Sequence, residues 1–212
     1  MSQPDTPQRL LDAAERLFAV EGFHNTSLRA ITGAAEANLA AVKYHFGSKE
    51  ALLVAVFERR LVPLNKLRQE RLEAVRAAAR RAGTPPATAE VLRAFIEPTL
   101  AFRDSGPGAE AFVRLVGRAI AEPDDTIRKI FMQMMKPLFL LIYDSLGEAL
   151  PELPPTERFW RQHFALGALS HAMCLAGRFE ILPAGVASGS DAAALTGMML
   201  NFLTAGMEAP CT

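Results

Sequence analysis

Residues 38–49, with the sequence NLAAVKYHFGSK, place three hydrogen-bonding side chains in a row among small apolar residues. The three are Lys43, Tyr44 and His45, and Lys49 follows after a Gly-Ser pair. A lysine ammonium group can donate to guanine or to a phosphate, and an alanine can contact the methyl group of thymine. Small side chains also let a helix axis approach the edges of the bases. The segment therefore has the composition of a helix that contacts a nucleic acid.

His171 and Cys174, three residues apart, raise a different chemistry, in which an imidazole activates a thiol nucleophile. A working nucleophile also needs an orienting carboxylate or amide and an oxyanion site, and the sequence contains no motif for them. The pair is too sparse for a zinc site, which takes about three or four ligands. Because no phosphate-binding glycine loop occurs either, we expect no enzyme activity, no metal and no cofactor.

The composition is that of an ordinary globular protein, with 212 residues of which 50% are hydrophobic and 22% charged. The 23 basic and 23 acidic residues balance, so a nucleic-acid partner would be bound by the placement of charge and not by its amount. No apolar run approaches the roughly 18 to 20 residues that cross a bilayer, and the first residues lack the pattern of a signal peptide. We expect a cytoplasmic protein without a membrane partner.

Apolar residues at helical spacing predict four helices in the N-terminal part of the chain. Thr6 and Pro7 form the expected N-cap and first helical position, and Gly22 ends the first helix. A break at residues 36–38 separates two short helices, and Pro63 is expected to kink the last one. The predicted ranges are 7–21, 28–35, 39–46 and a helix that begins after Ser48.

The Gly-Thr-Pro-Pro segment at residues 83–86 is the clearest interruption of the helical pattern. No strand-like alternation bounded by hairpin signals appears, so the fold class is all-α. We expect an N-terminal helical region at residues 1–55 and a C-terminal helical region at residues 56–212. The predicted helical segments of the C-terminal part are 87–104, 109–122, 124–149, 155–178 and 191–208.

Two short helices joined by a tight break form the layout that inserts its second helix into the major groove of DNA. Val42 and Phe46 lie one turn apart and should pack inward, which leaves Ala40, Ala41 and Tyr44 on the outer face. The alternative is that Tyr44 and His45 are half-buried and that residues 47–49 are merely a turn. The expected DNA-contacting residues are Thr26, Ser27, Arg29, Asn38, Leu39, Ala40, Ala41, Lys43, Tyr44, His45 and Lys49.

Four segments of the N-terminal quarter resemble the DNA-binding domain of the TetR family of bacterial regulators. They are LDAAERLF at 11–18, GF at 22–23, TSLRAI at 26–31 and YHFGSKEAL at 44–52. Residues 38–49 are also similar to the PsrA-type branch, whose best-known member responds to long-chain fatty acids. The chain departs from the usual family pattern at Glu36, where glycine is common, and at Lys43, where tyrosine is common. A left-handed Glu36 would cost about 1 kcal/mol.

The resemblance implies a homodimer that binds a double-stranded DNA operator and a small-molecule effector. It also implies an N-terminal three-helix DNA-binding domain of the helix-turn-helix type at residues 1–55 and a C-terminal helical domain for ligand binding and dimerisation at residues 56–212. On that basis we expect a ligand-responsive transcriptional regulator, a repressor released from a palindromic operator by a mainly apolar effector such as a fatty acid or acyl-CoA. A helical enzyme and a ligand-binding module that acts through protein contacts remain as alternatives. Loss of sequence-specific DNA binding would favour either of them, and turnover of a bound ligand would separate the two.

Phenylalanines and methionines in the C-terminal part could line an adaptable apolar pocket, although such a stripe is also typical of plain core. The expected ligand-binding residues are Phe95, Thr99, Phe102, Arg103, Phe112, Phe131, Met135, Phe139, His163 and Met173. The last two helices have apolar faces with small residues, which suit either a dimer contact or an internal core. The expected dimer residues are Phe159, Phe164, Gly167, Leu175, Leu195, Met199 and Phe202.

Overall fold

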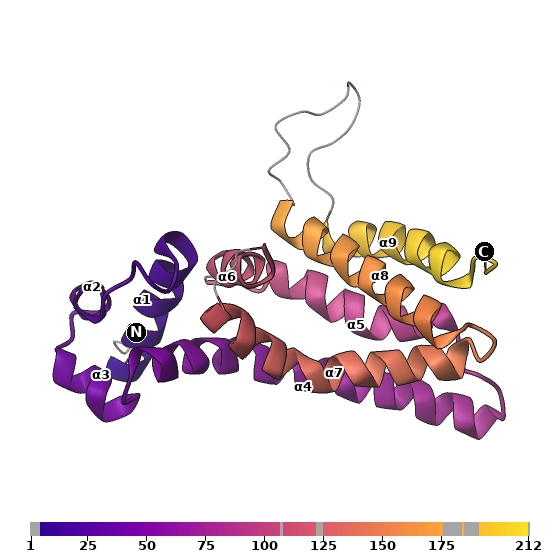
Figure 1. Ribbon diagram of the computed structural model, residues 1–212, viewed down its shortest axis with the longest axis horizontal. Helices are drawn as coiled ribbons and strands as arrows, with labels where there is room; N and C mark the ends of the chain where they lie inside the picture. The colour runs from indigo at the N-terminus through magenta and orange to yellow at the C-terminus, as the bar shows by residue number, and fades with distance from the viewer. Residues whose placement is uncertain (1–4, 107, 122–124, 176–183, 185–190, 212) are drawn as a thin grey trace. The chain divides into compact units, whose positions relative to one another are not determined.

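The computed structural model describes residues 5–106, 108–121, 125–175, 184 and 191–211. These residues form nine helices and no strand, which confirms the all-α prediction (Figure 1). None of these helices is both long and apolar enough to cross a bilayer. The helices are α1 (Thr6–Glu21), α2 (Leu28–Ala34), α3 (Leu39–His45), α4 (Lys49–Ala82), α5 (Thr88–Arg103), α6 (Ala109–Ala121), α7 (Asp125–Ala149), α8 (Pro155–Leu175) and α9 (Ala192–Glu208).

The chain divides into two compact units that are each discontinuous in sequence. The first unit comprises Met1–Pro63 and Gly106–Met134, and the second comprises Leu64–Ser105 and Met135–Thr212. Helices α4 and α7 therefore contribute residues to both units. The boundary expected after residue 55 separates a DNA-binding domain from an effector-binding domain. The compact units instead divide after residues 63, 105 and 134.

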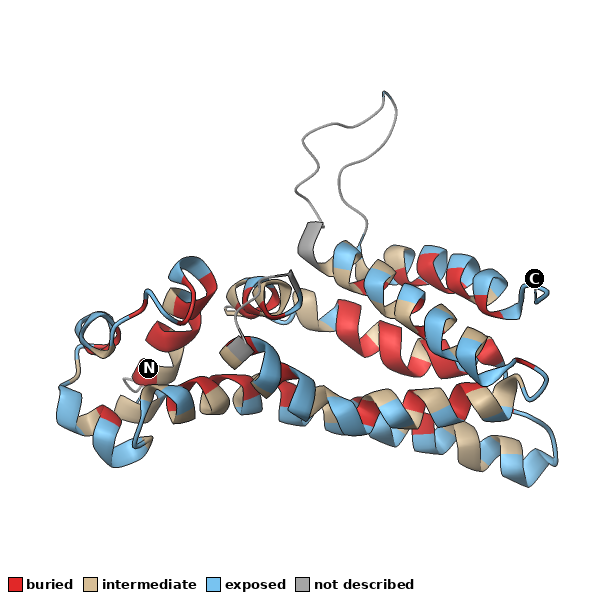
Figure 2. Cartoon of the chain, viewed as in Figure 1, coloured by how far each residue is buried: buried red, intermediate tan, exposed pale blue. Residues whose placement is uncertain are grey.

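In the first unit, α1 packs against α2, α3 and α6. Its apolar face, which includes Leu10, Ala14 and Phe18, is fully buried, as the red stripe on α1 in Figure 2 shows. The start of α1 lies one residue earlier than predicted, because the carboxylate of Asp5 and not the hydroxyl of Thr6 accepts from the helix amides, here that of Gln8 at 3.2 Å. Both side chains can cap a helix, so the local pattern did not separate them.

Polar side chains join α1 to α4 and α6 within this unit. Glu15 is buried, and its carboxylate pairs with the guanidinium groups of Arg59 and Arg60 on α4. Arg118 of α6 donates to the carbonyl oxygens of Ala19 and Val20 at 3.0 and 2.9 Å. These carbonyls belong to the last turn of α1, where a cation is favoured. Long-range ion pairs and hydrogen bonds thus join α1, which packs against α2 and α3 of the helix-turn-helix, to α4 and α6.

In the second unit, α5 packs against α8 and α9 around a continuous apolar core. The core draws further side chains from α4 and α7. The predicted helical segments are confirmed with small changes at their ends: Ala87 and Asp104 flank α5 as cap residues, and Asp191 caps α9 through its side chain. The predicted positions 122, 124 and 176–178 lie outside the described residues. Helix α4 continues through Pro63 as one helix.

Candidate functional site

Short polar side chains start each helix of the helix-turn-helix. The hydroxyl of Ser27 accepts from the amide of Ala30 at 3.0 Å, and the Oδ1 atom of Asn38 accepts from the amide of Ala41 at 2.8 Å. Ser48 does the same for α4, at 3.0 Å from the amide of Ala51. Each contact satisfies a helix amide that has no partner within the helix. These caps set where α2, α3 and α4 begin, and so which residues α3 exposes.

The turn between α2 and α3 contains a glutamate in the left-handed region. Glu36 has φ +49°, and it is the one non-glycine residue with positive φ among the described residues. The turn closes through backbone hydrogen bonds from Glu36 to Gly33 at 3.2 Å and from Ala37 to Thr32 at 2.9 Å. The turn therefore keeps a left-handed residue at Glu36, although glutamate lacks the conformational freedom of glycine.

Helix α3 has one buried side and one exposed side. Val42 is only 1% exposed, Phe46 is half-buried, and Tyr44 is 86% exposed. His45 is also exposed, so the alternative in which Tyr44 and His45 are half-buried is wrong. The remaining predicted residues of this helix, Leu39, Ala40, Ala41 and Lys43, are exposed apart from the half-buried Ala41.

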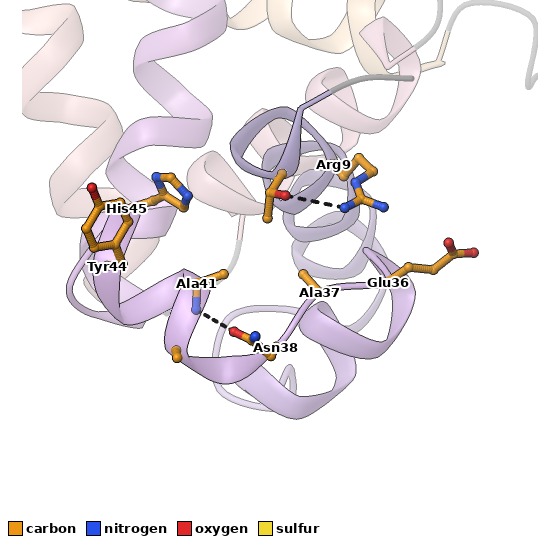
Figure 3. A pocket seen from close by; sticks show the side chains of 9 residues that line it. Arg9, Glu36, Ala37, Asn38, Ala41, Tyr44 and His45 are labelled. Atoms are coloured by element: carbon orange, nitrogen blue, oxygen red, sulfur yellow. Dashed lines mark hydrogen bonds between the residues drawn. The ribbon is translucent and has the colours of Figure 1, made fainter. Parts of the chain in front are cut away.

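Two residues of α1 join this surface, and the sequence analysis did not assign them to it. Thr6 and Arg9 line the same surface hollow as residues 36–38 and the exposed face of α3 (Figure 3). Arg9 donates to the hydroxyl of Thr6 at 3.4 Å, and its buried Nε atom has no hydrogen-bond partner among the described residues. No local signal connects residues 6–9 with residues 36–45, because their proximity depends on the packing of α1 against α3.

The other predicted DNA-contacting residues occupy different environments. Ser27 and Arg29 are exposed, and the ammonium group of Lys49 lies 4.4 Å from the centre of the Phe23 ring. Thr26, in contrast, is fully buried, and its hydroxyl donates to the carbonyl of Gly22 at 2.7 Å. The structure therefore gives Thr26 a place in the connection between α1 and α2 and not on the exposed face.

The ten residues expected to bind a ligand divide between the two units. Phe112 and Phe131 belong to the first unit, where their rings contact Phe57 at 5.7 and 6.1 Å between centroids. The other eight belong to the second unit. Within it, Phe139 and His163 have rings 5.2 Å apart, and Arg103 pairs with the neighbouring Asp104. The remaining ones are the buried Phe95 and Thr99 and the half-buried Phe102, Met135 and Met173.

The sequence analysis missed a buried arginine next to two of these residues, Phe95 and Thr99. Arg68 of α4 is only 4% exposed, and it donates to Asn65 and Thr99, at 2.8 Å in each case. Its guanidinium carbon lies 4.6 Å from the centre of the Phe95 ring, and Asn65 contacts the sulfur of Met135 at 3.7 Å. Burial lowers the pKa of Arg68 to about 9, because the surroundings disfavour the charged form.

A signal for this burial does exist in the sequence. Leu64, Arg68 and Leu72 follow one another at intervals of four residues, and both leucines are buried. Arg68 thus occupies a core position of α4. The segment contains many arginines and glutamates, most of them at solvated positions. The sequence analysis therefore did not distinguish Arg68, which faces inward, from the other basic residues.

The predicted dimer residues divide between the surface and the core. Phe159, Phe164, Gly167 and Phe202 are exposed, with 66% for Phe164 and 73% for Phe202. Met199 is buried in the core of the second unit, and Leu195 is half-buried against it. The side chain of Leu175 lies outside the described residues, as does that of Cys174 in the imidazole–thiol pair.

Comparisons with known proteins agree with this architecture. Residues 10–56 match the family model described as "Bacterial regulatory proteins, tetR family", and residues 93–206 match "Tetracyclin repressor-like, C-terminal domain". The HTH-type transcriptional regulator UidR of Escherichia coli (strain K12) is 40% identical over 55 residues. This similarity covers 26% of the present chain and 28% of UidR, so only about a quarter of that relative is matched.

Solved structures match over nearly the whole chain. The fatty acid degradation regulator FadR from Bacillus halodurans has a TM-score of 0.69 at 15% identity, over 99% of this chain and 100% of FadR. A TetR-family transcriptional regulator from Bordetella parapertussis has a TM-score of 0.62 at 18% identity, over 95% of both chains. GusR of Salmonella enterica has a TM-score of 0.59 at 18% identity, over 99% of both. Identities this low show a shared fold.

The two family models together span the helix-turn-helix and most of the C-terminal helices, and the second alone matches more than half of the chain. Members of this family are DNA-binding regulators and not enzymes. The chain belongs to the TetR family of bacterial transcriptional regulators.

Proposed function

We propose that this regulator is a cytoplasmic repressor that binds a palindromic operator as a homodimer and is released by a mainly apolar effector such as a fatty acid or acyl-CoA. The observation that carries the DNA-binding part is the two-sided character of α3. Val42 anchors the helix inside the first unit, while Tyr44 and the small Ala40 lie outside. Such a helix can enter the major groove because its axis can come close to the base edges.

Base contacts and phosphate contacts come from different residues in this proposal. Lys43 is exposed on α3 and is assigned to a base edge. His45, Lys49 and Arg29 are assigned to phosphates, and the amides at the start of α4 add to them. Arg9 joins this set, because its side chain lines the hollow beside α3. Residues 1–55 then form the DNA-binding domain, and residues 56–212 serve effector binding and dimerisation.

The proposed dimer contact lies on α8 and α9. Phe159, Trp160 and Phe164 on α8 and Met198 and Phe202 on α9 are large apolar side chains that are all more than one third exposed. The two helices pack against each other, so these side chains belong to neighbouring elements (Figure 1). Exposed apolar side chains gathered on adjacent helices are typical of protein contacts. A two-fold dimer would bury them, and it requires two half-sites related by a dyad in the operator.

The effector class is supported by the phenylalanine and methionine content of the second unit, with Phe95, Phe102, Met135, Phe139 and Met173 among the described residues. FadR from Bacillus halodurans, whose name gives it a role in fatty acid degradation, shares the fold at 15% identity. Release from DNA requires that the effector bind more tightly to a conformation that does not fit the operator. A difference of about 1 to 3 kcal/mol is enough for such a switch.

The first experiment compares Lys43→Ala with Lys49→Ala in operator binding. Lys49→Ala should weaken binding to all sequences and lower the slope of log affinity against log salt concentration by about one. Lys43→Ala should instead relax the preference at one position in each half-site. Lys66→Ala, which changes an exposed lysine of the second unit, serves as the control and should do neither. Equal losses in the two variants with unchanged base preference would contradict the assignment.

The second experiment measures the effector response. Trp160 is the only tryptophan of the chain, and it lies within 6.1 Å, between ring centroids, of Phe159, His163 and Phe164. Its fluorescence therefore reports on the proposed dimer contact. Purified protein is titrated with fatty acids of graded length, their coenzyme A esters and planar aromatic compounds, while operator binding is followed in parallel. An aromatic compound that lowers DNA affinity where no acidic lipid does would refute the lipid effector.

A further inference from the structure

The buried charge of Arg68 has no counterpart in its surroundings. Among the described buried side chains of the second unit it is the only charged one, and no carboxylate of the described residues forms an ion pair with it. Its neighbours on α4 differ in this respect, since Arg71 pairs with Glu97 and Arg76 with Glu148. Burying a charge without an opposite charge is unfavourable. A buried arginine without a paired carboxylate among the described residues is therefore a specific feature of this position.

Two neutral side chains hold the guanidinium plane without compensating its charge. Asn65 accepts from Nη1 and Thr99 from Nη2, each at 2.8 Å. The hydroxyl of Thr99 in turn donates to the carbonyl of Phe95 at 2.6 Å, so its single proton is already used. A guanidinium has five N–H donors, and Nε of Arg68 has no partner among the described residues. The group is oriented and retains donors for an anion.

Apolar side chains also lie near this cation. The Phe95 ring lies against the guanidinium, and the sulfur of Met135 contacts Asn65. Methionine has three rotatable bonds and fits ligands of different shape. Phe95, Thr99 and Met135 are also three of the residues that the sequence predicts to bind a ligand. A charged head and an apolar body could thus be recognised at one place.

We propose that Arg68 binds the carboxylate of an apolar monocarboxylic acid, which is the effector of this regulator. The inference rests on the proposed function and narrows its effector class from fatty acid or acyl-CoA to the free acid. A carboxylate carries one negative charge and two acceptor oxygens, so it neutralises one guanidinium and can accept two parallel N–H bonds. The thioester carbonyl of an acyl-CoA is neutral and would leave the charge of Arg68 uncompensated. Its phosphates carry more charge than a single buried arginine can balance.

Burial lowers the pKa of Arg68, and an anion in contact with the guanidinium would raise this pKa because it favours the charged form. Binding would then stabilise the fold in proportion to the logarithm of ligand concentration. It would also require the side chains around Arg68 to move apart, and such a movement is a means to shift the protein between two conformations.

The test compares dodecanoate, dodecanol and dodecanoyl-CoA on the full-length protein, with thermal unfolding and operator binding as readouts. Dodecanoate should raise the midpoint of unfolding and weaken operator binding at concentrations about tenfold or more below those of dodecanol, because the alcohol has the same chain without the charge. Dodecanoyl-CoA should act no more strongly than the alcohol. Equal potency of acid and alcohol, or higher potency of the thioester, would overturn the inference.

The variant Arg68→Met tests whether Arg68 is the residue that binds the carboxylate. Methionine fills a similar volume without a buried charge, so the variant should be at least as stable as the unmodified protein. It should respond equally to dodecanoate and dodecanol, while Arg71→Met, which removes a half-exposed and paired arginine, should keep the preference for the acid. A preference for the acid retained in Arg68→Met would refute the assignment. The comparison of ligands on the unmodified chain decides the ligand class even if Arg68→Met does not fold.

These outcomes remain separate from the proposed DNA binding. Unliganded protein that binds no specific DNA sequence would contradict the proposed repressor, whatever the ligands do. Protein that binds its operator and responds to dodecanol as well as to dodecanoate would leave the repressor in place and remove the role of Arg68.

Discussion

Replacing Glu36 by glycine should stabilise the protein, although it removes a side chain. Glu36 has φ +49°, in the left-handed region, where a residue with a Cβ atom pays about 1 to 2 kcal/mol. Its exposed side chain makes no hydrogen bond or ion pair among the described residues and points away from Tyr44 and His45 (Figure 3). Glycine removes the steric cost but adds about 0.4 to 1 kcal/mol of chain entropy to the unfolded state. The expected net gain in the free energy of unfolding is about 0.5 to 1 kcal/mol.

Urea denaturation of the full-length chain measures this gain. The midpoint of Glu36→Gly should move to higher urea with an unchanged slope, and the thermal midpoint should rise by about 1 to 4 °C for a protein of this size. Glu36→Ala is the matched control, because it removes the carboxylate but keeps the Cβ atom, and it should give no gain. Glu36→Asn should fall between the two, since asparagine tolerates this conformation better. If Glu36→Gly and Glu36→Ala have the same stability, strain at Glu36 is not the cause.

Three further predictions concern a contact between α6 and α1, the proposed dimer contact and an ion pair of the second unit. Arg118→Met removes two hydrogen bonds to the last turn of α1 and should lower the free energy of unfolding by about 1 to 2 kcal/mol, measured in urea. Phe164→Asp places a charge in the proposed dimer contact and should convert a dimer into a folded monomer, as sedimentation would show; a dimer that persists would place the contact elsewhere. The hydrogen bond from Arg76 lowers the pKa of Glu148, so this pair adds stability above the ordinary carboxyl pKa of 4.5 and loses it as the pH falls through the lowered value. Glu148→Gln should therefore reduce stability at neutral pH and weaken its dependence on pH in acid, measured by denaturation at a series of pH values.

Most helix boundaries could be predicted because their signals are local. Ser27 and Ser48 cap the helices that follow them, and Gly22 ends α1 with φ +81°. A cap depends on the contact between a side chain and an amide two or three residues away, which spacing along the sequence is sufficient to indicate. The prediction was one residue late at Asp5, since two adjacent residues could both serve as cap.

The all-α fold, the helix-turn-helix and the two faces of α3 could be predicted from the sequence, because helical periodicity sets Val42 and Tyr44 on opposite sides once the helix forms. Contacts between residues that are distant in the sequence depend instead on how the helices pack. Arg9 reaches the hollow beside α3, and Arg68 comes to lie against Phe95, through packing between helices. The burial of a side chain, and the pKa shift that burial causes, depend on all the helices packed around it. A local sequence pattern describes only the helix to which the side chain belongs.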